Sequence, residues 1–84
     1  MDIRSYIKQN FKNNKIEEIS DAINSSISEH DEITLPGLGV FFELLWENSN
    51  ESDKSNILNT LKQALNWFFY KNVLKKIDKN QLLD

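Results

Sequence analysis

Apolar residues recur at helical spacing in the first third of the chain. A series at i, i+4 and i+8 predicts a short amphipathic helix over about residues 3–12; its members are Ile3, Ile7 and Phe11. An isoleucine series at i, i+3, i+7 and i+11 predicts a second helix over about residues 15–29; its members are Ile16, Ile19, Ile23 and Ile27. Carboxylates fall in the first turns of this second helix, where the helix dipole favours anions.

Residues 35–46 read Leu-Pro-Gly-Leu-Gly-Val-Phe-Phe-Glu-Leu-Leu-Trp and hold the only proline and both glycines of the chain. Proline fixes φ near about −65°, and glycine reaches φ values that other residues avoid. We therefore interpret Pro36, Gly37 and Gly39 as a structural turn and not as a ligand site. We expect a positive φ or a close helix approach at Gly37 or Gly39, so that alanine there would cost about 1 kcal/mol or more.

The apolar run after this turn is compatible with a buried helix or a strand, because periodicity alone does not separate the two in a short run. A stripe at i, i+1, i+4 and i+5 favours a helix over about residues 38–47; its members are Val40, Phe41, Leu44 and Leu45. Asn50 with Asp53, or Ser52 alone, then provides a helix cap. A last helix is predicted over about residues 52–77, since no glycine or proline interrupts its apolar pattern.

These helices predict an all-α fold, a small bundle of about four helices. We expect a single domain over residues 1–84, in which residues 66–84 form a basic and aromatic C-terminal extension. One shared core is expected to enclose apolar residues from three of the helices. The expected core residues are Ile19, Ile23, Val40, Leu44, Trp46, Leu58 and Leu61.

Composition restricts the protein class. The 84 residues contain 39% hydrophobic residues, which is enough for a modest core, and no cysteine, so no disulfide or thiolate metal site is available. The N-terminus lacks the apolar segment of a signal peptide, and the longest apolar run is far below the roughly 20 residues of a membrane-spanning helix. We therefore expect a soluble, intracellular protein.

Charge is strongly segregated along the chain. Residues 16–53 carry ten acidic groups and no Lys or Arg, whereas residues 1–15 and 54–84 are basic. An acidic middle disfavours a broad nucleic-acid surface, because duplex binding depends on many phosphate contacts. Balance of charge within a folded bundle is the favoured interpretation.

No enzyme signature is present. The only histidine, His30, lies in a polar loop, and Gly37 with Gly39 makes a lone G-x-G without the rest of a phosphate-binding motif. Glu43 and Glu47 are interpreted as the solvated edge of the third helix. We predict no catalytic residue, no cofactor site and no metal site, and hence a non-enzymatic protein.

Residues 33–41 also resemble the start of the sheet in HU-type DNA-binding proteins, which follows two N-terminal helices in a similar order. That family has Phe where this chain has Leu38, and its strands lead into a basic arm that is absent here. An HU-like nucleic-acid-binding protein is thus a minor alternative. A helical adaptor or regulator that binds another protein is a stronger one.

Four consecutive aromatic residues lie near the C-terminus: Trp67, Phe68, Phe69 and Tyr70. Consecutive residues cannot all face one side of a helix, so at least one or two of them should remain exposed in a lone monomer. Core extension, a protein-contact surface and membrane association are all open, in decreasing order. We predict a protein interface at these four residues, most simply in a homodimer, with nucleic acid and membranes as unlikely partners.

Residues 35–46, followed by the Glu51-to-Lys54 and Thr60-Leu61 segments, resemble the central block of the I-type small acid-soluble spore proteins of endospore-forming bacteria. The resemblance extends through roughly residues 1–65, and residues 66–84 look like an extension beyond it. It implies a small protein made in the developing forespore and stored in the spore core. It does not imply the DNA coating of the unrelated α/β-type spore proteins.

Overall fold

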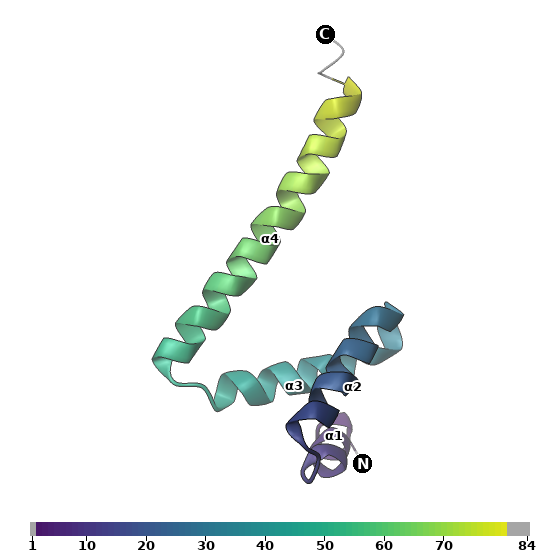
Figure 1. Ribbon diagram of the computed structural model, residues 1–84, viewed down its shortest axis with the longest axis vertical. Helices are drawn as coiled ribbons and strands as arrows, with labels where there is room; N and C mark the ends of the chain where they lie inside the picture. Colours follow the sequence, from purple (N-terminus) through teal and green to yellow (C-terminus); the bar gives the residue numbers. More distant parts are fainter. Residues whose placement is uncertain (1, 81–84) are drawn as a thin grey trace. The chain divides into compact units, whose positions relative to one another are not determined.

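In a computed structural model, the backbone is described for residues 2–80 and the side chains for residues 2–73. The described residues form four α-helices and one 3-10 turn and contain no strand (Figure 1). The elements in chain order are α1 (Ile3–Phe11), α2 (Ile16–Glu29), η1 (Glu32–Thr34), α3 (Leu35–Glu47) and α4 (Glu51–Asn80). The all-α class and the four helices are confirmed. The HU-like alternative is not supported, because it requires paired strands after Pro36.

Short polar side chains fix where the helices start. The Asp2 carboxylate accepts a hydrogen bond from the Ser5 N–H at 2.7 Å and caps α1. The Asn50 side chain accepts one from the Asp53 N–H at 2.7 Å before α4, which is one of the two caps that the sequence offered. Helix starts are therefore specified locally, and the observed bounds differ from the predicted ones by up to three residues.

The largest shift concerns α3, which begins at Leu35 and not at residue 38, directly after η1. Pro36 lies in the first turn of α3, where the missing proline N–H has no helical partner to lose. Neither Gly37 nor Gly39 has a positive φ, so the predicted glycine bend is wrong. The sharp change of direction occurs instead at His30, whose φ of 51° ends α2 and whose N–H donates to the Ile27 carbonyl.

The core of residues 1–48 lies between α1 and α3, and α2 also contacts α3. Ile7 on α1 and Val40 on α3 are the buried apolar residues of the described chain. Beside them the rings of Phe11 and Phe41 meet edge to face, with centroids 5.1 Å apart. The core is therefore small and consists of one line of contacts between two helices.

Most of the residues that the sequence predicted for a shared core are not buried. Leu58 and Leu61 on α4 are 50% and 45% exposed, which contradicts their predicted burial. Among the other expected members Val40 is buried, and the rest are half-buried; these are Ile19, Ile23, Leu44 and Trp46. Periodicity identified the apolar faces correctly but did not show which faces meet.

The chain divides into two compact units, residues 1–48 and residues 49–84. The first unit contains the helices α1, α2 and α3, and the second contains α4. The organisation of residues 1–84 as one domain stays a prediction.

Replacing Gly37 or Gly39 by alanine is expected to stabilise the protein, in contrast to the sequence-based expectation. Both positions are helical, and alanine gains roughly 0.5–1 kcal/mol over glycine inside a helix. A Cβ at Gly37 would lie 3.6 Å from Ile7 Cδ1, an ordinary contact, and one at Gly39 would meet nothing within 4 Å. The midpoint of thermal unfolding, followed by far-ultraviolet circular dichroism, should rise for each variant.

Ile7→Ala is the matched control, because it removes one of the two buried apolar side chains among the described residues and should cost about 2 kcal/mol or more. A lower midpoint for Gly37→Ala and Gly39→Ala would show that the glycines are needed for backbone freedom after all.

Candidate interaction surface

The surface with the most exposed apolar side chains lies on α4. Leu58, Leu61 and Leu65 are 50%, 45% and 58% exposed, and Phe68 continues the same series at 67%. Because the spacing is three, four and three residues, these side chains share one face of the helix. We call these four residues the leucine stripe.

The four residues that the sequence predicted as an interface lie in the same part of α4 as Phe68. Trp67, Phe68, Phe69 and Tyr70 are between 56% and 69% exposed, so all four lie at the surface. The rings of Trp67 and Tyr70 are stacked with centroids 6.2 Å apart, and Lys71 Nζ lies 5.8 Å from the Trp67 ring centroid, within reach of a cation–π contact. Around residues 67–70, the surface of α4 is therefore apolar on more than one side of the helix.

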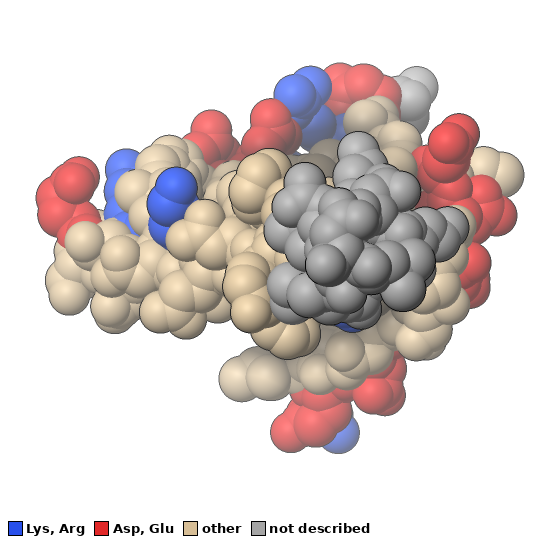
Figure 2. Space-filling model, turned by 90° about the horizontal axis from the view of Figure 1, so that it is seen from above, with Lys and Arg blue, Asp and Glu red and all other residues tan. Residues whose placement is uncertain are grey.

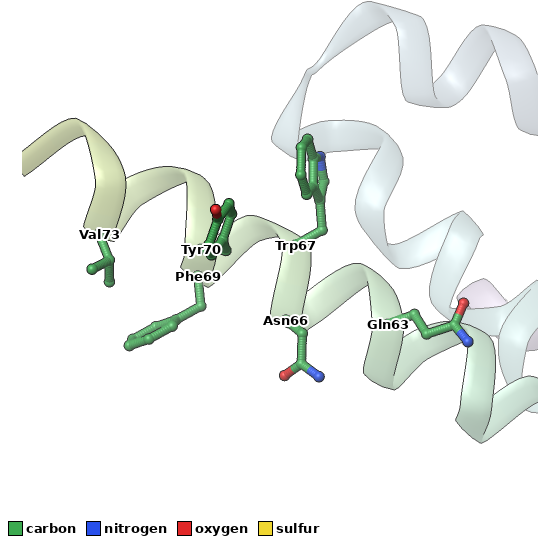
Figure 3. Close-up of a pocket in the computed structure, with 6 residues that line it drawn as sticks. All are labelled: Gln63, Asn66, Trp67, Phe69, Tyr70 and Val73. Atoms are coloured by element: carbon green, nitrogen blue, oxygen red, sulfur yellow. The ribbon is translucent and has the colours of Figure 1, made fainter. Parts of the chain in front are cut away.

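An open hollow of about 520 Å³ lies along α4 between these side chains, and Figure 3 shows the residues that line it. In this view the Trp67 and Tyr70 rings rise from one side of the helix, whereas Phe69 and Asn66 point to the other. Gln63 and Val73 complete the lining. Because the hollow is open and lies along a single helix, it does not enclose a ligand.

A second apolar surface lies on α2. Its isoleucine series is incompletely covered, since Ile16 is 81% and Ile27 is 53% exposed. Ile16, Ile19 and Ile23 line a hollow of about 370 Å³ together with two polar residues. This surface belongs to residues 1–48 and is described separately from α4.

An ion pair joins α1 to α3 at the edge of the core. Arg4 donates from Nε to Glu43 Oε1 at 2.8 Å and from Nη2 to Glu43 Oε2 at 2.9 Å, so the pair is bidentate. The i, i+4 spacing from Glu47 predicted that Glu43 is a solvated residue. The structure shows that the Glu43 side chain is instead paired with Arg4. Arg4 is the only arginine of the chain, but nothing in the local sequence signals a partner 39 positions away.

The ion pair shifts both ionisation equilibria. The hydrogen bond from Arg4 and the nearby positive charge lower the pKa of Glu43, and the same hydrogen bond raises the pKa of Arg4. At the start of α1, the hydrogen bond from the Ser5 N–H lowers the pKa of Asp2. These shifts are explained by helix capping and by α1–α3 contact, and they do not indicate a catalytic group.

The remaining candidates do not assemble into a reactive site in the part of the chain that the structure describes. His30 is exposed and serves as the left-handed end of α2. Within residues 2–73, whose side chains are described, no three His, Cys, Asp or Glu side chains lie close enough to hold a metal ion. The turn residues Pro36, Gly37 and Gly39 lie in the first turns of α3 and form no cradle for a ligand.

Two further surface properties bear on partners. On the face shown in Figure 2, the described Lys and Arg side chains are spread among Asp and Glu side chains and form no single basic area. None of the described helices combines the length and the apolar character that crossing a membrane requires. The exposed apolar surface of α4 is thus the most distinctive feature of the described chain.

Comparison with known proteins shows that residues 1–65 are similar to a class of small spore proteins. A family model described as "Small, acid-soluble spore protein I" matches residues 1–65. A protein of that name from Geobacillus sp. is 42% identical over 65 residues, which cover 77% of this chain and 92% of the relative. The protein of the same name from Bacillus licheniformis is 40% identical over 65 residues, or 77% of this chain and 93% of the relative. No solved structure matches.

The chain belongs to the small, acid-soluble spore protein I family. The match ends within α4, after the leucine stripe has reached Leu65 and before the four consecutive aromatic residues. The family is therefore shown for the first unit and the first half of α4, and residues 66–84 lie outside it.

Glu43→Gln is expected to reduce the loss of stability that acid causes. Because the folded-state pKa of Glu43 is lowered from its ordinary value of 4.5, its contribution is fully present above pH 4.5 and is lost as the pH falls through the lower folded value. Urea unfolding of wild type at pH 7 and pH 3 should therefore show a larger fall in midpoint than Glu43→Gln does.

Glu47→Gln is the matched control, since it removes the same charge one turn further along α3 and leaves the Arg4–Glu43 hydrogen bonds intact. An equal reduction of the acid effect by both variants would indicate overall charge and not this ion pair.

Proposed function

We propose that this chain is a non-enzymatic protein of the spore core that acts by binding protein, in the first place a second copy of itself. The family membership supports a role in the spore. The observation that carries the proposed mechanism is the apolar surface of α4, which includes the leucine stripe and the four aromatic residues. Contiguous apolar surface of this kind is a mark of interaction sites, whereas scattered single residues are not.

The distribution of apolar residues supports self-association and not a permanent monomer. Fifteen large hydrophobic side chains are exposed among the described residues, against two buried ones. A chain of 84 residues encloses only a limited part of its surface, so the remaining apolar area is available for contact with another chain. Exposed aromatic residues such as Phe68 and Phe69 are also a type that is enriched at interfaces.

A helical adaptor that binds a different protein is the second candidate function. The stacked pair of Trp67 and Tyr70, with Lys71 beside it, favours this candidate because it lies outside the matched family residues. Under this candidate the first 65 residues keep the family role and the aromatic pair recruits the partner. Nucleic acid and membranes are not proposed as partners.

Self-association can be measured by sedimentation velocity of the full chain from micromolar to millimolar concentration. We expect the wild-type mass to rise above that of one chain, and the double variant Phe68→Gln/Phe69→Gln to weaken association roughly tenfold or more, because two exposed aromatic side chains are lost from the contact.

The matched control is Ile16→Gln, which removes an even more exposed apolar side chain from α2. It should leave the mass distribution unchanged. A wild-type chain that remains strictly monomeric at the highest concentration would exclude the homodimer and leave the adaptor as the proposed mechanism.

A further inference from the structure

The spacing of the leucine stripe is the same in both directions along α4. Leu58, Leu61, Leu65 and Phe68 are separated by three, four and three residues, so the series is symmetric about Gln63. In heptad terms the four residues occupy positions a, d, a and d. When such a series is reversed, each a position falls at the level of a d position, as antiparallel helix pairs require.

We propose that α4 pairs with α4 of a second copy in antiparallel orientation, centred at Gln63, with the leucine stripe as the interface. This inference rests on the proposed self-association and gives it a geometry. Leu58 then lies at the level of Phe68 of the second copy, and Leu61 lies at the level of Leu65. The two-fold axis repeats both contacts, so four apolar layers form from one stripe.

The charges at the two ends of α4 favour this orientation over a parallel one. The first turn of α4 carries Glu51 and Asp53, whereas Lys71 lies near the other end of its described side chains. In the antiparallel register, Asp53 of one copy is only two residues from the level of Lys71 of the other, an axial offset of about 3 Å. In a parallel pair, each of these charged residues would instead lie beside the same residue of the second copy, so that like charges meet.

The same register leaves part of the aromatic surface uncovered. Trp67 and Tyr70 occupy positions on the side of α4 away from the leucine stripe, in agreement with their ring-to-ring stacking. Phe69 borders the stripe and closes its edge. A dimer built on the leucine stripe therefore keeps the Trp67–Tyr70 pair free for a further partner.

Distances between spin labels on the two copies test the orientation directly. The chain has no cysteine, so Ser52→Cys and Gln63→Cys each provide one labelling position in the full-length protein. With a rise of about 1.5 Å per residue, the antiparallel register offsets the two labels at residue 52 by about 33 Å along the helices, and because residue 52 also faces away from the leucine stripe the labels are about 40 Å apart. Gln63 lies on the side of α4 opposite the leucine stripe, so the two labels at residue 63 are expected at about 20–25 Å, the distance between packed helices plus the half-width of each helix.

Leu61→Gln should remove the label-to-label coupling at both positions, whereas Tyr70→Gln should retain it. Equal distances of about 20–25 Å at residues 52 and 63 would indicate a parallel pair and overturn the inference while leaving self-association in place. A distance at residue 63 well above about 25 Å in an associated protein would place the interface outside α4, again overturning only this inference. A monomer in sedimentation would overturn the proposed self-association itself.

Discussion

Contact between α1 and α3 holds residues 1–48 together. Ile7 and Val40 provide its buried apolar part, the edge-to-face rings of Phe11 and Phe41 extend it, and the Arg4–Glu43 ion pair closes its edge. Because so few residues are buried, each of these contacts carries a large share of the stability that a small domain has. The position of α2 depends on this pair, since it contacts α3.

The helices were predictable because their signals are local. Isoleucines at helical spacing identified α2, and an asparagine followed three residues later by an aspartate identified the start of α4. The Pro-Gly segment led to a wrong prediction because a proline has two common locations. It occurs in turns, and it also occurs in the first turn of a helix, as Pro36 does here. The residue that makes the bend is His30, whose left-handed backbone has no sequence signal as strong as a glycine.

Tertiary relations were less accessible from the sequence. An apolar stripe shows that a helix has a face to bury, and it does so equally for the half-buried Ile19 and for the exposed Leu58. Likewise, the bidentate pair of Arg4 and Glu43 depends on how α1 crosses α3, which no local pattern encodes. The family resemblance was recognisable because its residues form a dense block with fixed spacing, and the exposure of the aromatic cluster followed from the geometry of consecutive helical residues.

The matched family residues end at residue 65, yet α4 continues to Asn80 without interruption. The leucine stripe and the aromatic residues are thus parts of one rigid helix, and their angular relation is fixed by the number of residues between them. A single inserted or deleted residue at the boundary would turn everything beyond it by about 100° and shift it by about 1.5 Å. The number of residues at the boundary therefore determines the direction in which the C-terminal surface faces. A substitution there keeps this direction, whereas an insertion or deletion changes it.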